Sequence, residues 1–127
     1  MGDIKSFAAI YKPYKELTMR LLLLSIFFLS GNLFAKEVVV EIFKKEFIPA
    51  EITIEQGDTV IWKNIEKRQY HNVWFKQFDK EEPEYFFPDE SYQRQFDVSG
   101  VFPYECGPHP LMKGKVTVVT KSSSTNK

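Results

Sequence analysis

The sequence has a single cysteine, Cys106, among its 127 residues. One thiol excludes an intramolecular disulfide, so no internal covalent crosslink can stabilise the fold. Histidine is almost as scarce, with two residues in the whole chain, and beyond the N-terminal region the only methionine is Met112. A metal site built from nitrogen and sulfur would therefore have to use these few side chains.

The chain also lacks a surplus of either charge, because 17 Lys and Arg residues balance 17 Asp and Glu residues. Residues 1–35 contain four basic and two acidic side chains, which leaves 13 basic and 15 acidic residues in the remainder. Since there is no excess of cations to neutralise phosphates, we expect no nucleic-acid partner.

The hydrophobic stretch over residues 21–35 is too short and too interrupted by polar residues to span a bilayer comfortably. It follows Arg20 and ends in the small residue Ala35, which is the pattern of a secretory signal segment over residues 1–35, cleaved after Ala35. Met19 is an alternative start of the chain. The competing interpretation is an uncleaved membrane anchor. In either case the globular part would be exported, and we expect it in the periplasm.

The region after Ala35 shows a two-residue apolar alternation, which is typical of half-buried strands. Turn residues such as Gln56-Gly57-Asp58 separate the alternating segments. Many short strands without a helical pattern predict an all-β sandwich, formed by one domain over residues 36–120. The segments that alternate most clearly are residues 51–55, 59–64, 71–75, 92–98, 101–106 and 115–119.

Two segments lack this alternation. Residues 76–90 contain two prolines and, from residue 81 onward, five acidic side chains, so we expect a long surface loop with at most a short helical turn. Residues 121–127 are polar and rich in serine, and we expect them to form a flexible tail.

The most informative motif is Cys106-Gly-Pro-His109-Pro-Leu-Met112, in which a thiol, an imidazole and a thioether lie within seven residues. The next strand is expected to begin near Gly114. His71 is the other histidine, and its place in the alternating segment directs it toward the core. Two imidazoles, one thiolate and one weakly bound thioether form the ligand set of blue-copper electron-transfer sites.

This motif resembles the ligand loop of the cupredoxins, or blue copper proteins, in the short C-x2-H-x2-M form of their amicyanin-like members. The plastocyanin-like members have a longer loop. Residues 56–64 and 71–73 are similar to the upstream half of the same family, and the likeness covers residues 38–119. Tyr70 departs from the pattern, because amicyanin-like sequences tend to have proline there. The resemblance implies a cupredoxin-like Greek-key β-sandwich that holds one copper ion. It also implies that His71, Cys106 and His109 are the equatorial ligands and that Met112 is the long axial ligand.

The resemblance also implies that Asn72 supports the ligands without touching the metal. Its backbone amide would donate to the Cys106 sulfur, and its side chain would tie the two ligand loops together. Because His109 lies in a loop, we expect its ring edge to reach the surface, surrounded by an apolar docking rim of Pro108, Pro110 and Leu111.

Three classes of function fit these observations. The favoured one is an exported, monomeric carrier of single electrons, which is not an enzyme and docks briefly on donor and acceptor redox proteins. The acidic residues 81–90 would either steer a basic partner toward the site or form an ordinary solvated surface. The second is a module for copper storage or delivery with the same ligands. The third is an enzyme with Cys106 as nucleophile, although prolines on both sides of His109 suit a metal better than a substrate.

Overall fold

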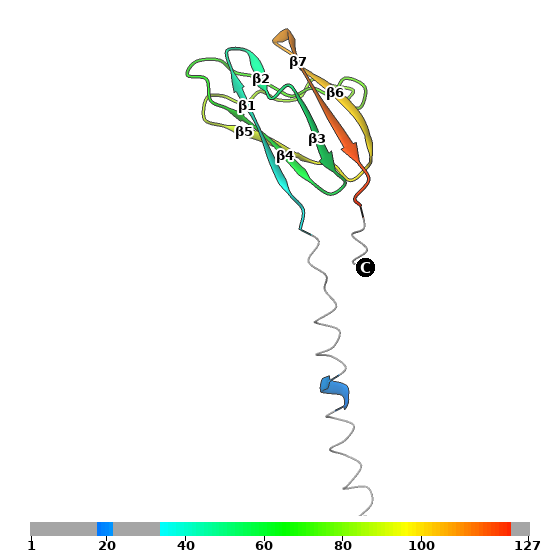
Figure 1. Cartoon of the computed structure of the whole chain (residues 1–127). Helices are drawn as coiled ribbons and strands as arrows, with labels where there is room; N and C mark the ends of the chain where they lie inside the picture. Colours follow the sequence, from blue (N-terminus) through cyan, green and yellow to red (C-terminus); the bar gives the residue numbers. More distant parts are fainter. Residues whose placement is uncertain (1–17, 22–33, 123–127) are drawn as a thin grey trace, which may run out of the picture. The chain divides into compact units, whose positions relative to one another are not determined.

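The computed structural model describes residues 18–21 and 34–122 (Figure 1). The chain divides into two units, residues 1–34 and 35–127, which are considered separately. In the first unit, residues 18–21 form one helical turn, and most of the predicted signal segment lies outside the described residues. Within the described ranges, no helix has the length and apolar character needed to cross a membrane.

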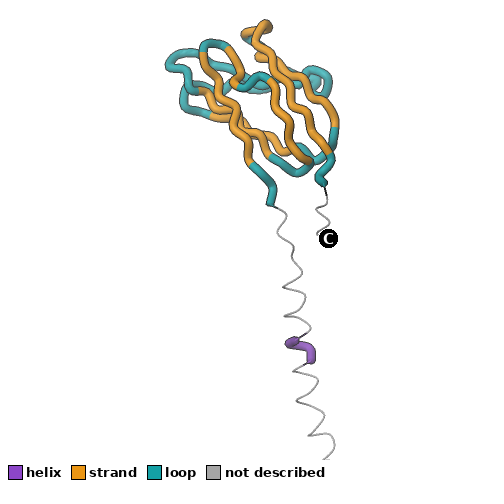
Figure 2. The backbone as a smooth tube through the Cα atoms, in the orientation of Figure 1, coloured by secondary structure: helices purple, strands orange, loops and turns teal. Residues whose placement is uncertain are grey.

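The second unit contains two β-sheets, which confirms the prediction of a mostly β sandwich (Figures 1 and 2). The first sheet has the order β2-β1-β4-β5, and the second has the order β3-β7-β6. Loops connect the strands at both ends of the sandwich (Figure 2). The strands are β1 (Glu37–Phe43), β2 (Glu46–Ile48), β3 (Glu51–Glu55), β4 (Thr59–Asn64), β5 (Ser91–Gln95), β6 (Gly100–Cys106) and β7 (His109–Val119).

Alternation along the strands sends one set of side chains between the sheets. In the first sheet β1 runs parallel to β4, with Val40 opposite Trp62, and both are fully buried. In the second sheet β3 runs parallel to β7, and Ile54 lies opposite Val118. All four side chains belong to the core, and the residues between them along each strand face outward.

Aromatic rings fill the centre of this core. The indole of Trp62 packs edge-on against the rings of Tyr104 and Phe75, with ring centroids 5.3 Å and 5.9 Å away. The ring of Phe96 lies 5.9 Å from that of Phe75 and 6.5 Å from that of Trp62. Such edge-to-face pairs stabilise a core beyond the area that they bury. They hold β4 and β6, and through β6 they support Cys106 at its end.

Several boundaries differ from the sequence prediction. Residues 71–75 do not form a strand of a sheet but make two isolated bridges, His71 with Phe86 and Trp74 with Glu105. β7 begins at His109, several residues before the expected start near Gly114. Residues 76–90 form a loop without a helix, as expected, yet they are not confined to the surface, because Phe86 is only 7% exposed and belongs to the core. Residues 123–127 of the predicted tail lie outside the described range.

Candidate metal centre

Cys106 and His109 are brought together by the hairpin between β6 and β7. Cys106 is the last residue of β6 and is fully buried, and its partner across the hairpin is His109, the first residue of β7. The register shifts between Glu105 and Cys106, where a bulge lets the two-residue turn Gly107-Pro108 close the hairpin. The spacing of three residues therefore aims both side chains at one point.

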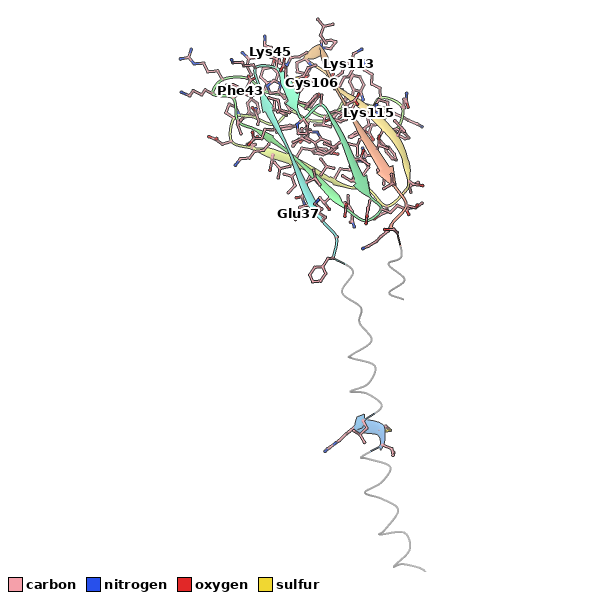
Figure 3. All side chains as sticks on the ribbon, in the orientation of Figure 1. Glu37, Phe43, Lys45, Cys106, Lys113 and Lys115 are labelled. Atoms are coloured by element: carbon pink, nitrogen blue, oxygen red, sulfur yellow. The ribbon has the colours of Figure 1, made fainter. Side chains whose placement is uncertain are left out.

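His71 reaches the same point from the other part of the chain. Its amide donates to the carbonyl of Phe86 at 3.1 Å, and the amide of Phe86 donates back at 2.8 Å, which fixes the backbone of His71. Nδ1 of His71 lies 3.6 Å from Sγ of Cys106, and Nδ1 of His109 lies at the same distance. The three ligand atoms lie within 4.8 Å of one another, at the end of the sandwich where Figure 3 labels Cys106 and Lys45.

These distances fit one metal ion between the three atoms. An ion about 2.0 Å from each nitrogen and about 2.3 Å from the sulfur, with angles of about 120°, separates sulfur from nitrogen by about 3.7 Å. The observed separations of 3.6 Å match this value. A trigonal set of two imidazoles and one thiolate is the arrangement that selects copper for electron transfer. The donor set therefore fits one type 1 copper ion.

Met112, the expected axial ligand, also lies at this end of the molecule. It is buried in β7, at 5% exposure, and it lines a surface depression of about 410 Å³ together with His109 and the hairpin between β1 and β2. Met112 follows His109 by three positions along the strand, and the Met112 side chain belongs to the core. A thioether completes the soft donor set without adding charge.

Burial sets the protonation states of the ligands. It lowers the pKa of His71, against an opposing effect of Glu66, and it also lowers the pKa of His109, helped by the charge of Lys45. Both imidazoles are therefore neutral at neutral pH, with lone pairs free for a metal. Burial raises the pKa of Cys106, and the Asn72 amide opposes this effect. Metal binding must therefore displace the thiol proton.

Glu66 is a supporting residue that the sequence reasoning missed. Its carboxylate Oε2 lies 3.5 Å from Nε2 of His71, and its side chain is 9% exposed. The amide of Lys45 donates to Oε1 of Glu66 at 2.5 Å, and the amide of Glu66 donates to the buried Asn64 side chain at 3.1 Å. This carboxylate lies behind the distal nitrogen of the ring whose Nδ1 faces Cys106, close enough to act on it electrostatically. Its place in the charged run Glu66-Lys67-Arg68 gave no signal of this position.

Asn72 makes the contacts that were expected of it and two more. Its amide donates to Sγ of Cys106 at 3.5 Å, and its Oδ1 accepts a hydrogen bond from the amide of Gly107 at 2.6 Å. Its Nδ2 donates to Oε1 of Glu82 and to the carbonyl of Pro83, both at 3.0 Å. The last two partners come from the acidic loop, which the sequence analysis had not connected to the site.

The residues of the expected rim are placed around the metal-binding end. Leu111 is 95% exposed, Pro110 is exposed, and Pro108 is half-buried in the turn before His109. The imidazole of His109 is itself only partly covered. The structure therefore brings an apolar edge next to a ligand that reaches the surface. Whether a partner docks there is a prediction that needs a binding measurement.

Comparison with known proteins agrees with the geometry. Residues 35–119 match the family described as copper binding proteins of the plastocyanin/azurin family. The chain is 41% identical to amicyanin of Paracoccus versutus over 88 residues, which are 66% of each protein, and 36% identical to amicyanin of Paracoccus denitrificans over 85 residues, which are 64% of each. It thus spans just under two thirds of the length of these two relatives.

The fold also matches solved structures. The crystal structure of amicyanin from Paracoccus versutus superposes with a TM-score of 0.61 at 38% identity, and the match covers 69% of this chain and 86% of that one. A plastocyanin of Scenedesmus fuscus is 34% identical over 84 residues, which are 57% of this chain and 85% of the plastocyanin. Sequence and structure therefore point to the same family.

Proposed function

The chain belongs to the plastocyanin/azurin family of copper-binding proteins, and from this premise we propose that it carries single electrons between redox proteins. The cofactor is one type 1 copper ion, which supplies a one-electron couple between Cu(I) and Cu(II). The observation that carries the proposal is the convergence of one sulfur and two Nδ1 atoms, at 3.6 Å each, inside a packed β-sandwich.

We propose that His71, Cys106 and His109 would hold the copper ion and that Met112 would add a weaker thioether contact, as the family resemblance implies. The buried side chains are held by the β6–β7 hairpin and by the bridge of His71 to Phe86, so they need little movement when the charge at the site changes. Little rearrangement means a low barrier for electron transfer, because no ligand or water shell has to reorganise.

The chain is a carrier and not an enzyme. A nucleophilic cysteine must reach its substrate and must be deprotonated, whereas Cys106 is fully buried and its burial raises the pKa of the thiol. His109 contacts the sulfur through Nδ1, the atom that the metal needs. This geometry serves coordination and leaves no room for a substrate at the sulfur.

The partners are redox proteins that dock transiently on a monomeric carrier. The surface around His109 supports this, since Leu111 and Pro110 offer a small apolar patch that suits brief contacts rather than a stable complex. Electrons would enter or leave through the exposed edge of His109.

We place the protein in the periplasm, exported by the segment over residues 1–35. The unit that matches the copper-binding family starts at residue 35, directly at the expected cleavage position. Mass spectrometry of the exported protein should give an N-terminus at Lys36. A full-length mass in the membrane fraction would instead support an anchor.

The test of the function begins with spectra of residues 36–127 after addition of Cu(II). A strong thiolate-to-Cu(II) band in the visible range and a narrow hyperfine splitting in the EPR spectrum are expected, and Cys106→Ala should abolish both. Retention of the full visible band by Cys106→Ala would refute the ligand assignment.

Two further measurements separate a shuttle from a module for copper storage or delivery. A shuttle gives reversible voltammetry and holds its copper for hours against a competing chelator. Loss of the metal to the chelator within minutes, together with poor turnover at an electrode, would favour delivery.

A further inference from the structure

The acidic loop supplies a carboxylate to the gap between the two ligand loops. Oε1 of Glu82 accepts a hydrogen bond from Nδ2 of Asn72 at 3.0 Å, and the carbonyl of Pro83 accepts a second one at the same distance. On its other side, Oδ1 of Asn72 accepts the amide hydrogen of Gly107 at 2.6 Å. The Asn72 side chain is therefore held between Glu82 and the residue that follows Cys106.

Gly107 leaves the space that this carboxylate occupies. An ideal Cβ atom on Gly107 would overlap the carboxylate of Glu82 and would lie 3.1 Å from Nδ2 of Asn72. Backbone conformation does not explain the glycine, since the positive φ angles among the described glycines belong to Gly57 and Gly100. The absence of a side chain at residue 107 is thus explained by the approach of Glu82.

Glu82 is also a negative charge without a nearby cation. Glu105, which directly precedes Cys106, is paired with Lys76 at 2.6 Å. Among residues 34–122, Glu82 forms no such ion pair. Glu82 therefore places a carboxylate without an ion pair against Asn72, at the gap between the two ligand loops.

We propose that Glu82 is a positioning residue of the copper site, which orients Asn72 and lowers the reduction potential, and that Gly107 is required to admit it. The inference rests on the proposed function for its effect on the potential, although the contact itself exists without a metal. When the side-chain amide of Asn72 is held in place, its backbone amide stays in position to donate a hydrogen bond to Sγ of Cys106. A nearby negative charge favours Cu(II) over Cu(I), because the oxidised site carries one more positive charge.

The first test compares two substitutions that remove the same charge. Glu82→Gln should raise the reduction potential of the copper site. At a fixed applied potential, the Cu(I)-to-Cu(II) ratio should increase by about twofold to tenfold, and a tenfold change corresponds to about 59 mV for one electron. Glu81→Gln is the matched control, because Glu81 is the neighbouring residue of the same loop and has no hydrogen bond to Asn72. Equal shifts for the two variants would refute a specific role of Glu82.

A double-mutant cycle tests the requirement for Gly107. Gly107→Ala should displace the flexible carboxylate and should raise the potential in the same direction as Glu82→Gln. In the Gly107→Ala background, Glu82→Gln should shift the potential no more than Glu81→Gln does, since the two sites act through one contact. A full additional shift would show that the two residues act independently, which contradicts the proposal.

A readout without copper separates this inference from the function itself. In NMR spectra of the copper-free protein, Glu82→Ala and Gly107→Ala should each move the side-chain amide resonances of Asn72, whereas Glu81→Ala should leave them in place. Unchanged resonances in all three variants would overturn the inference while leaving the copper site intact. If Glu82→Ala and Gly107→Ala move these resonances but the wild-type protein gives no type 1 spectrum with Cu(II), only the proposed function would be refuted.

Discussion

Met112 is the ligand whose replacement should change the site without destroying it. Met112→Leu keeps a buried apolar side chain of similar volume, so we expect the protein to fold and to retain copper through the other three ligands. Loss of the weak thioether donor should disfavour Cu(II) and raise the reduction potential. Voltammetry measures the shift, and Ile54→Leu, another substitution of a buried residue but on β3, is the control. An unchanged potential would remove Met112 from the coordination sphere.

Tyr104 allows a prediction about stability at high pH. Its burial raises the pKa to about 12, and within the described residues its hydroxyl has no hydrogen-bond partner. A raised pKa means that the folded state binds the proton more tightly than the unfolded chain, whose tyrosine titrates near pH 10. The stabilisation is complete below about pH 10 and is lost as pH rises to about 12, by about 2 to 3 kcal/mol.

Urea unfolding at pH 9 and pH 11.5 tests this prediction. Tyr104→Phe should have the same or higher free energy of unfolding at neutral pH, because it removes an unpaired buried hydroxyl. It should also lose less stability between the two pH values than the wild type. Tyr70→Phe, at a ring that is 43% exposed, is the control and should keep the wild-type loss. An identical loss in Tyr104→Phe would contradict the assignment.

The ligands and the supporting residue Asn72 could be predicted from the sequence, whereas the supporting residues Glu66 and Glu82 could not. Cysteine and histidine are so rare in this chain that few alternative ligand sets exist. The C-x2-H-x2-M spacing from Cys106 to Met112 also indicated a ligand loop by itself. Glu66 and Glu82 are two of many acidic residues, and both lie in irregular segments where no periodicity indicates direction. Their contacts depend on where the loops lie in three dimensions, which residue spacing does not report.

At the scale of elements, the turn between β3 and β4 is held by one buried carboxylate. Asp58 is 7% exposed, its Oδ2 accepts the amide hydrogen of Glu55 at 3.0 Å, and its Oδ1 accepts that of Lys36 at 2.9 Å. It thus joins this turn to the residue that precedes β1. Asp58→Ala leaves both amides without these acceptors and should lower the free energy of unfolding by about 2 to 4 kcal/mol.

Chemical denaturation of the copper-free domain measures this loss. Asp97→Ala, at an exposed aspartate of the segment between β5 and β6, is the matched control and should change stability by less than about 0.5 kcal/mol. Asp58→Asn should fall between the two, because the amide retains one acceptor oxygen. If Asp58→Ala is as stable as Asp97→Ala, the turn does not depend on this carboxylate.

The regular strands were predicted well because their physics is local. β3 and β4 have the predicted limits, since alternation and the Gly57 turn act over a few residues. Residues 71–75 alternate in the same way but have no long partner strand, so they form only isolated bridges. β7 starts earlier than predicted because His109 pairs with Cys106 despite the neighbouring prolines. Strand pairing depends on both segments, so the alternation within one segment does not predict whether that segment will find a partner strand.

At the scale of the whole molecule, charge is distributed unevenly. Residues 81–90 carry five carboxylates and no cation, and among residues 34–122 none of the five forms an ion pair. The hairpin between β1 and β2 carries Lys44 and Lys45, which line the depression beside His109. The surface near the metal centre therefore has an acidic part and a basic part. Such a division orients an approaching charged partner before contact.

Electron transfer to a cationic oxidant should accordingly depend on salt. Between ionic strengths of about 0.01 and 0.2 M, we expect the bimolecular rate constant for a cationic cobalt complex or a basic cytochrome to fall by roughly twofold to tenfold, because the Debye length shrinks to below about 10 Å. The variant Glu81→Gln/Glu84→Gln should flatten this dependence. It leaves Glu82 and its contact with Asn72 in place.

The matched control places the same charge change far from the copper. Glu37→Gln/Glu55→Gln removes the carboxylate at the start of β1 and the one at the end of β3. Both lie in the opposite part of the sandwich, where Figure 3 labels Glu37 away from Cys106. Both double variants have the same net charge, so a difference between them measures the position of the charge and not its amount. Equal slopes for the two variants would show that only net charge matters, and the acidic loop would then be solvated surface without a role in docking.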